Sequence, residues 1–305
     1  MKKQGKRWFF GGSGAVIALA SAAWVWAQAP AQLPLDPVHS AGQNVTPAYE
    51  GWYQLPDGTF NLLVGYYNRN TKESIDIPVG PNNHVDPGGP DLGQPTHFLP
   101  GRQWGVFVIN VPKDFGATKR VTWTIVANGK PATVPFHLDP VYNVAPFKDA
   151  TNNTPPFLGW SDNGPFMQGP PIKITQTYTA TAGEPLTLNI WGGDDNVIPP
   201  GVQAGGGGRR GRMATPFIVN WRKFRGPGDV TFGAARPPVE KGDYQVPKPA
   251  VFTGKASTTA TFTEPGDYIL EVVGNDISGD GGAGFQCCWT TLQAKVTVKP
   301  AAGSK

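Results

Sequence analysis

Residues 255–299 constrain the fold most strongly, because they read as three successive strands with apolar side chains at every second position. A Pro-Gly turn at Pro265–Gly266 separates the first strand from the second, and a Gly/Asp-rich loop separates the second from the third. Three alternating strands with turns between them are typical of an antiparallel β-sandwich. The inward face is predicted to carry Ala260, Phe262, Tyr268, Leu270, Val272, Leu292, Ala294, Val296 and Val298, and the outward face Glu271, Gln293, Lys295 and Thr297.

The run ATFTEPGDYILEVVGND, followed later by AKVTV, resembles the closing strands of PKD-like and other bacterial immunoglobulin-like domains. The resemblance covers about residues 172–299 and implies a fold, not an activity. It also implies that Tyr268 forms a tyrosine corner, in which a buried hydroxyl holds the preceding turn. Such domains are extracellular spacers, adhesion modules or carbohydrate-associated modules. This chain departs from the pattern by a Gly/Arg-rich insertion and by the sequence Cys287-Cys288-Trp289.

An earlier part of the chain predicts a second sandwich of the same class. Alternation over 59–67 and 120–126, with a nearly continuous apolar run at 104–111, indicates strands, and Asn128-Gly129 predicts a tight hairpin. The fold class that we expect is therefore all-β, with two immunoglobulin-like antiparallel sandwiches in tandem after an N-terminal signal peptide. The predicted division is a signal peptide at 1–27, a Pro-rich lead-in at 28–48, sandwiches at 49–142 and 172–299, a Pro/Asn/Gly-rich linker at 143–171, and a tail at 300–305.

The N-terminus has the pattern of an export signal. A basic segment with four Lys and Arg side chains precedes an apolar stretch at 8–26, and cleavage after Ala27 fits the small-residue rule. An uncleaved membrane anchor is the alternative, although Gly11, Gly12 and Gly14 interrupt the apolar run. We therefore expect an exported protein of the bacterial periplasm or exterior, which meets a membrane only through this segment if it is not cleaved.

The positive charge of the chain belongs to this signal. The chain has 26 basic and 22 acidic residues, and removing the four basic residues of the signal leaves 22 of each. A balanced mature chain gives no reason to expect a nucleic-acid partner. Hydrolase signals are also absent, because no Ser lies in a G-x-S-x-G turn and every His precedes residue 140. We expect a protein that is not an enzyme and needs no cofactor.

Three loops carry residues that could bind a ligand. The insertion GGGGRRGR places Arg209, Arg210 and Arg212 together, where they could contact an anionic polysaccharide or lipid or simply be solvated. Asp194, Asp195, Asp276 and Asp280 flank strands and could supply part of the ~6–8 oxygen ligands of calcium, although their spacing matches no established calcium loop. The loop 78–100 contains His84, Asp86, Asp91 and His97, for which a solvated connection is the simpler interpretation.

Cys287 and Cys288 are the only two cysteines in the chain, and export would place them in an oxidising compartment. We expect them to form a vicinal disulfide. Adjacent α-carbons lie about 3.8 Å apart across a trans peptide, below the ~4.4–6.8 Å usual for a disulfide, so the bond should be easier to reduce than an ordinary one. Beside Trp289 and Phe285 it would form a rigid apolar plate for a flat ligand such as a sugar ring, or it would only stiffen the loop.

Two functions remain open at this point. The first is a non-catalytic binding or structural protein of the periplasm or cell surface, carbohydrate-associated or bound to another envelope protein. The second is a redox or metal-handling protein that uses Cys287-Cys288 with help from His84, His97 or Met213.

Overall fold

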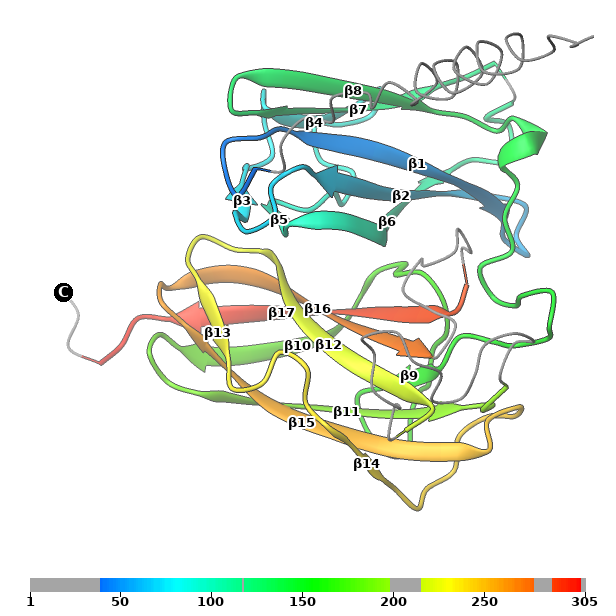
Figure 1. The fold of residues 1–305 in the computed structure, drawn as a ribbon, viewed down its shortest axis with the longest axis vertical. Coiled ribbons are helices and arrows are strands. Elements are labelled where there is room, and N and C mark those ends of the chain that lie inside the picture. The colour runs from blue at the N-terminus through cyan, green and yellow to red at the C-terminus, as the bar shows by residue number, and fades with distance from the viewer. Residues whose placement is uncertain (1–38, 117, 198–214, 277–286, 303–305) are drawn as a thin grey trace, which may run out of the picture. The chain divides into compact units, whose positions relative to one another are not determined.

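The computed structural model describes residues 39–116, 118–197, 215–276 and 287–302, and the description below is confined to them. Residues 39–305 form one compact unit. The regular secondary structure of this unit is almost entirely strand, with one short 3-10 helix, η1 (Pro140–Tyr142), among the described residues. Figure 1 shows the strands gathered into two sandwiches that follow one another along the chain. The predicted all-β class with two tandem immunoglobulin-like sandwiches is confirmed.

The first sandwich is built from two main sheets with strand orders β1-β2-β6 and β4-β7-β8, and a two-stranded β3-β5 ladder lies beside them. The pairs within both main sheets are antiparallel. The bounds are β1 (Val45–Gln54), β2 (Phe60–Asn68), β3 (Ile75–Asp76), β4 (Asn83–Asp86), β5 (His97–Phe98), β6 (Gly101–Val111), β7 (Val121–Ala127) and β8 (Lys130–Phe136).

The second sandwich has one sheet with the order β10-β17-β16-β12 and another with the order β13-β15-β11-β9, on which β14 also pairs with β15. One pair differs from the antiparallel expectation, because β10 runs parallel to β17. The bounds are β9 (Phe157–Gly159), β10 (Ile174–Thr181), β11 (Leu186–Asp194), β12 (Phe217–Arg225), β13 (Val230–Phe232), β14 (Val239–Lys241), β15 (Phe252–Phe262), β16 (Gly266–Asp276) and β17 (Trp289–Lys299).

Two local predictions are confirmed at the level of single residues. Asn128 and Gly129 both have positive φ, at 50° and 71°, as a two-residue hairpin turn between β7 and β8 requires. The Tyr268 hydroxyl donates to the Glu264 carbonyl at 2.8 Å and accepts from the Gly228 amide at 3.0 Å. The Tyr268 side chain is fully buried, so the tyrosine corner implied by the resemblance is formed.

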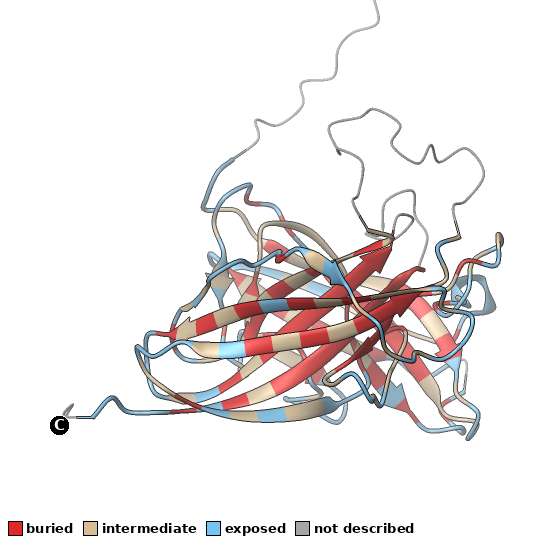
Figure 2. Cartoon of the chain, turned by 90° about the horizontal axis from the view of Figure 1, so that it is seen from below, coloured by how far each residue is buried: buried red, intermediate tan, exposed pale blue. Residues whose placement is uncertain are grey.

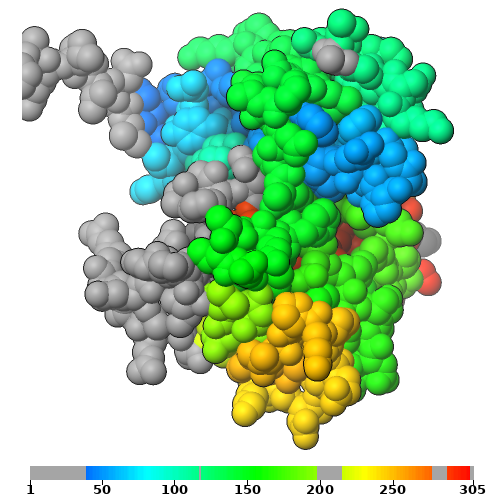
Figure 3. All heavy atoms as spheres, turned by 90° about the vertical axis from the view of Figure 1, so that its right-hand side faces the viewer, coloured from blue at the N-terminus to red at the C-terminus, as the bar shows by residue number. Residues whose placement is uncertain are grey.

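Sequence alternation missed several strands because they are short or lie in Pro-rich segments. β1 begins inside the predicted lead-in, β4 lies in the predicted loop 78–100, and β9 lies in the predicted linker, where it pairs with β11. Trp160 and Met167 of that linker pack against the core of the second sandwich, as their apolar character suggested. Figure 3 shows this part of the chain, in green, crossing the surface from the first sandwich to the second. The exact domain limits stay a prediction.

Each sandwich has its own core. One cluster gathers apolar side chains of the first sandwich around Trp123 and also contains Phe224 of β12, and a second gathers those of the second sandwich around Tyr268. Figure 2 shows buried residues running unbroken along several strands instead of alternating. β16 is buried at every position from Leu270 to Asp276, because both faces of its sheet are covered. The prediction that Glu271 and Gln293 face outward to solvent is therefore wrong: they are 0% and 8% exposed.

Candidate functional site

The outer face of the β10-β17-β16-β12 sheet meets β6 and its neighbouring loops, and strand β12 supplies most of the contacts. Arg225 forms a bidentate ion pair with Asp91 at 2.7 and 2.9 Å and donates from Nε to the Gln94 carbonyl. Lys223, which is 6% exposed, pairs with Asp76 at 3.0 Å. The Thr96 amide donates to the Phe224 carbonyl at 3.1 Å. These bonds connect residues more than a hundred positions apart and fasten one sandwich to the other.

Glu271 is the most deeply buried charge of this face. Its carboxylate accepts from Arg222 Nε at 2.7 Å and from the Gln293 amide at 2.9 Å. Arg222 also donates from Nη1 to the Gln103 side chain of β6 at 3.0 Å. Burial raises the pKa of Glu271, and the Arg222 guanidinium opposes that rise. The ion pair and its amides form a polar network that crosses from one sandwich to the other.

Glu50 forms the corresponding network on the first sandwich. It lies at an irregularity of β1, between Tyr49 and Gly51, and its carboxylate accepts from Arg102 Nη2 and from the Gly105 amide, both at 2.7 Å. Burial raises the pKa of Glu50 to about 7, against the opposing effect of Arg102. The Arg102 guanidinium also stacks on Trp104, 3.9 Å from its ring centre. Glu50 thus fixes Arg102 and Trp104 beside the outer face of the second sandwich.

Trp289 lies at the apolar centre of this contact region. It is 3% exposed and packs with Leu63 of β2 and Val273 of β16. Gly105 of β6 has a φ of +54°, and a Cβ there would come within 2.3 Å of the Trp289 ring, so this position requires glycine. The Trp289 ring therefore has little surface left for the stacking role predicted for it. Its Nε1 is buried and has no hydrogen-bond partner in the part of the chain that the structure describes.

A pocket of about 270 Å³ opens where these networks meet. Its walls come from β6, β12, β16 and β17, with Arg236 from the loop after β13. Arg236 is exposed and donates from Nε to the Asn220 side chain at 2.7 Å. The lining residues are Leu99, Arg102, Gln103, Trp104, Asn220, Trp221, Arg222, Arg236, Val273, Asn275 and Trp289. We call this the Arg236 pocket.

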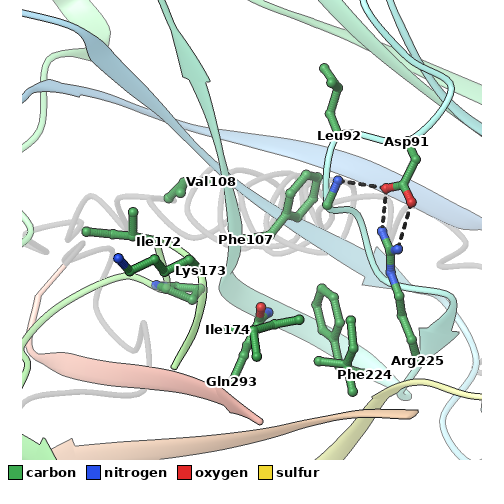
Figure 4. A pocket seen from close by; sticks show the side chains of 13 residues that line it. Asp91, Leu92, Phe107, Val108, Ile172, Lys173, Ile174, Phe224, Arg225 and Gln293 are labelled. Carbon is green, nitrogen blue, oxygen red and sulfur yellow. Dashed lines mark hydrogen bonds and ion pairs between the residues drawn. The ribbon is translucent and has the colours of Figure 1, made fainter. Parts of the chain in front are cut away.

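A second pocket, of about 330 Å³, lies farther along the same contact region (Figure 4). Phe107, Phe224, Ile174 and Val108 give it apolar walls, and the Asp91–Arg225 ion pair closes one end (Figure 4). The charges of Asp91 and Arg225 are paired with one another, and Lys173 is a further cation on the wall of this pocket.

The predicted disulfide between Cys287 and Cys288 is present, with the α-carbons 3.1 Å apart and a cis peptide between them. The two residues are 3% and 0% exposed. Both sulfurs lie near the Asn153 carbonyl, at 4.0 and 3.5 Å. The pair therefore packs against the segment that precedes β9. Its predicted companion Phe285 lies outside the described residues.

Three of the four predicted calcium ligands lie close to one another. Asn153 donates to Asp276 at 2.7 Å, and Thr154 donates to Asp195 from its amide at 2.9 Å and from its hydroxyl at 2.8 Å. Burial, with smaller contributions from the charges of Asp276 and Asp195, raises the pKa of Asp194 to about 8. Within the described residues no three acidic, His or Cys side chains are placed to hold one metal ion. Asp280 lies outside those residues, and calcium binding stays a prediction.

The remaining predicted residues are either dispersed or not described. Arg209, Arg210, Arg212 and Met213 lie outside the described residues. In the loop 78–100, His84 pairs with Asp86 at 3.3 Å, His97 pairs with Asp76 at 2.9 Å, and Asp91 pairs with Arg225. The loop side chains thus have separate partners. In the part of the chain that is described, no helix is long and apolar enough to span a membrane.

Sequence reasoning missed Glu50, Arg102, Arg222 and Arg236 as site residues. Arg222 is one of three cations in the sequence WRKFR, yet it is buried against Glu271. One signal was available: Arg222 and Glu271 each lie at a predicted outward position of a strand that is otherwise strongly apolar. A charge in such a strand can indicate a second buried face, but alternation by itself does not name the partner.

No family model matches the chain, and no curated protein matches it. Among solved structures, domains 4 and 5 of the S-layer protein SbsC are 10% identical, with 84% of this chain and 98% of that chain covered and a TM-score of 0.22. A titin A168–A169 structure is 11% identical, with 83% and 98% covered and a TM-score of 0.23. The D00-D0 domain of intimin is 9% identical, with 84% and 100% covered and a TM-score of 0.23. Likenesses this distant carry no argument about function, and they do not single out the PKD-like group.

Proposed function

We propose that this chain is an exported, non-catalytic binding or structural protein of the bacterial periplasm or cell surface. The observation that carries the proposal is the contact region between the sandwiches. Two β-sandwiches fastened by the Lys223–Asp76 and Arg225–Asp91 ion pairs form a stiff support that presents loops and pockets in fixed positions. Such a support suits adhesion, spacing or recognition, in which the relative orientation of domains has to be maintained.

The character of the contacts supports a permanent arrangement. Lys223 and Arg225 of β12 have largely buried side chains and pair with Asp76 and Asp91 of the first sandwich. Separating the sandwiches would break these pairs and would uncover the Trp289 cluster. Domains joined only by a flexible linker would not need buried charges on facing strands. We infer that the two sandwiches act as one body in the envelope.

The redox alternative gains no support from the position of the disulfide. A thiol or disulfide that exchanges with a partner has to be accessible to an attacking thiolate. Cys287 and Cys288 are almost completely buried, and their sulfurs face the Asn153 carbonyl. We therefore favour a local structural role for the bond, in holding the entry to β17 against the segment before β9.

Location and binding can be tested with one tagged protein. Bacteria that express the full chain with a C-terminal tag are fractionated, and mass spectrometry determines the N-terminus. The mature form is expected to begin near Gln28 and to be found in the periplasm or medium. The purified mature form is then pelleted with envelope polysaccharide from the same cells.

An intact Met1 in the membrane fraction would contradict export. Turnover in a broad hydrolase and oxidase screen, abolished by one substitution, would contradict a non-catalytic role.

A further inference from the structure

The Arg236 pocket offers more hydrogen-bond donors than its own residues can pair. Trp289 is one of its lining residues, but its Nε1 is buried beside Gly105 and is not accessible from the pocket. Arg236 uses Nε for the Asn220 side chain, which leaves the terminal nitrogens of its guanidinium available. An acceptor-rich ligand would satisfy these nitrogens.

The charges around the pocket also favour an anion. Three guanidinium groups line it, from Arg102, Arg222 and Arg236. Glu50 pairs with Arg102 and Glu271 pairs with Arg222, whereas Arg236 has no carboxylate partner among the described residues. One positive charge is therefore left unpaired at the pocket. Guanidinium recognises carboxylate with two parallel hydrogen bonds, which makes this group the natural partner.

The volume of the Arg236 pocket and its other lining residues limit the chemical class of the ligand further. A volume of about 270 Å³ lies at the small end of ligand pockets, roughly 300–1,000 Å³, and suits one ring-sized group. Trp104 supplies an aromatic wall, and the Asn220 and Asn275 amides supply polar groups of the kind that bind hydroxyls. A ring that bears hydroxyls on its edges, a carboxylate, and an apolar C–H face matches these three features together.

We propose that the Arg236 pocket binds a uronic-acid residue of an acidic polysaccharide. Arg236 pairs with the carboxylate, the Asn275 amide binds a ring hydroxyl, and Trp104 packs against the ring. The inference rests on the proposed binding function and assigns it a ligand class and a place. Arg102 and Arg222 form part of the pocket wall. They are not assigned to the carboxylate, because Arg102 is paired with Glu50 and Arg222 with Glu271.

The test is calorimetry of the mature chain with trigalacturonate and with its fully methyl-esterified form. The ester keeps the rings and removes the charge. We expect trigalacturonate to bind. The ester should bind at least about tenfold more weakly, because a charged hydrogen-bonded pair is lost. Arg236→Gln should weaken trigalacturonate binding by a similar factor and leave the weak ester binding unchanged. Trp104→Leu should weaken both ligands. Lys241→Gln is the matched control, since it removes the same charge from exposed β14, which does not line the pocket.

Each opposing result is informative. No binding of trigalacturonate, equal binding of the ester, or full binding by Arg236→Gln with an unchanged melting temperature would overturn the assignment. Equal affinity for a glutamate-containing tripeptide, with the same dependence on Arg236, would overturn the sugar class. If envelope polysaccharide still pellets with Arg236→Gln, the site is wrong and the binding function stands. If the wild-type chain pellets with no envelope material, the binding function fails as well.

Discussion

The two faces of the β10-β17-β16-β12 sheet are buried to a similar extent but are made of different residues. The face toward the second core carries Leu270, Val272 and Val296, which are apolar and fully buried. The opposite face carries Glu271 and Gln293, and at its apolar centre Val273 and Trp289. The first face specifies the sandwich itself. The second face joins the two sandwiches through polar groups. If one sandwich folds before the other, this face therefore exposes no large apolar surface to water.

The largest expected effect comes from breaking the charge pair of the second face. Glu271→Leu leaves Arg222 buried without its partner and should lower the free energy of unfolding by about 3–5 kcal/mol. The double variant Arg222→Met/Glu271→Leu replaces the pair by apolar groups and should recover most of that loss. Urea unfolding of the two single variants and the double variant measures the coupling. A double variant as unstable as the sum of the singles would mean that the network as a whole is indispensable.

The next effect tests the apolar face on the same strand. Leu270→Ala creates a cavity in the second core and should lower the free energy of unfolding by about 3 kcal/mol. Val273→Ala, on the contact face, is the matched comparison, and it should cost about 1 kcal/mol because fewer atoms are removed from a smaller cluster. Urea unfolding measures both. If Val273→Ala costs as much as Leu270→Ala, the contact region is packed as a core in its own right.

The apolar face was largely predictable from sequence, and the polar face was not. Period-two alternation at Tyr268, Leu270 and Val272 is visible in any window, and the Pro-Gly turn fixes where it begins. The same alternation assigns Glu271 to solvent, because a polar residue opposite a core face normally contacts water. The covering strand β6 lies more than 150 positions away in the chain. No local pattern encodes that contact, and the Arg236 pocket exists only because of it.

The contact face should also make stability depend on pH. Burial raises the pKa of Glu50 from 4.5 to about 7, so between those values the folded state holds a proton that the unfolded state has lost. The free energy of unfolding should therefore fall by about 2 kcal/mol as the pH rises from 4.5 to 7. Glu50→Gln should flatten that slope in urea unfolding at several pH values. Some slope should remain, because burial also raises the pKa of Glu271 and Asp194. An unchanged slope in Glu50→Gln would show that Glu50 is ionised throughout.

A smaller effect is expected at the turn that closes the apolar face. Tyr268→Phe removes the hydroxyl that accepts from Gly228 and donates to Glu264, and should cost about 1–2 kcal/mol. Tyr67→Phe is the control, since Tyr67 is 42% exposed, and it should change the melting temperature little. Equal effects of the two changes would mean that the corner hydroxyl contributes nothing specific.

The smallest effect should come from the exposed edge of the contact face. Asp91 and Arg225 form a bidentate pair with good geometry, but the Asp91 side chain is 50% exposed, so water screens it. Asp91→Asn should therefore cost less than about 1 kcal/mol, against several for Glu271→Leu. The Arg225 hydrogen bonds lower the pKa of Asp91, so the contribution is present above the unfolded pKa of about 3.9 and is lost as the pH falls through the folded value. The difference between wild type and Asp91→Asn in thermal unfolding should be measurable at pH 7, shrink in high salt, and vanish near pH 2. If Asp91→Asn is instead as costly as Glu271→Leu, the pair at the edge and the pair at the centre contribute alike, and burial is not what separates them.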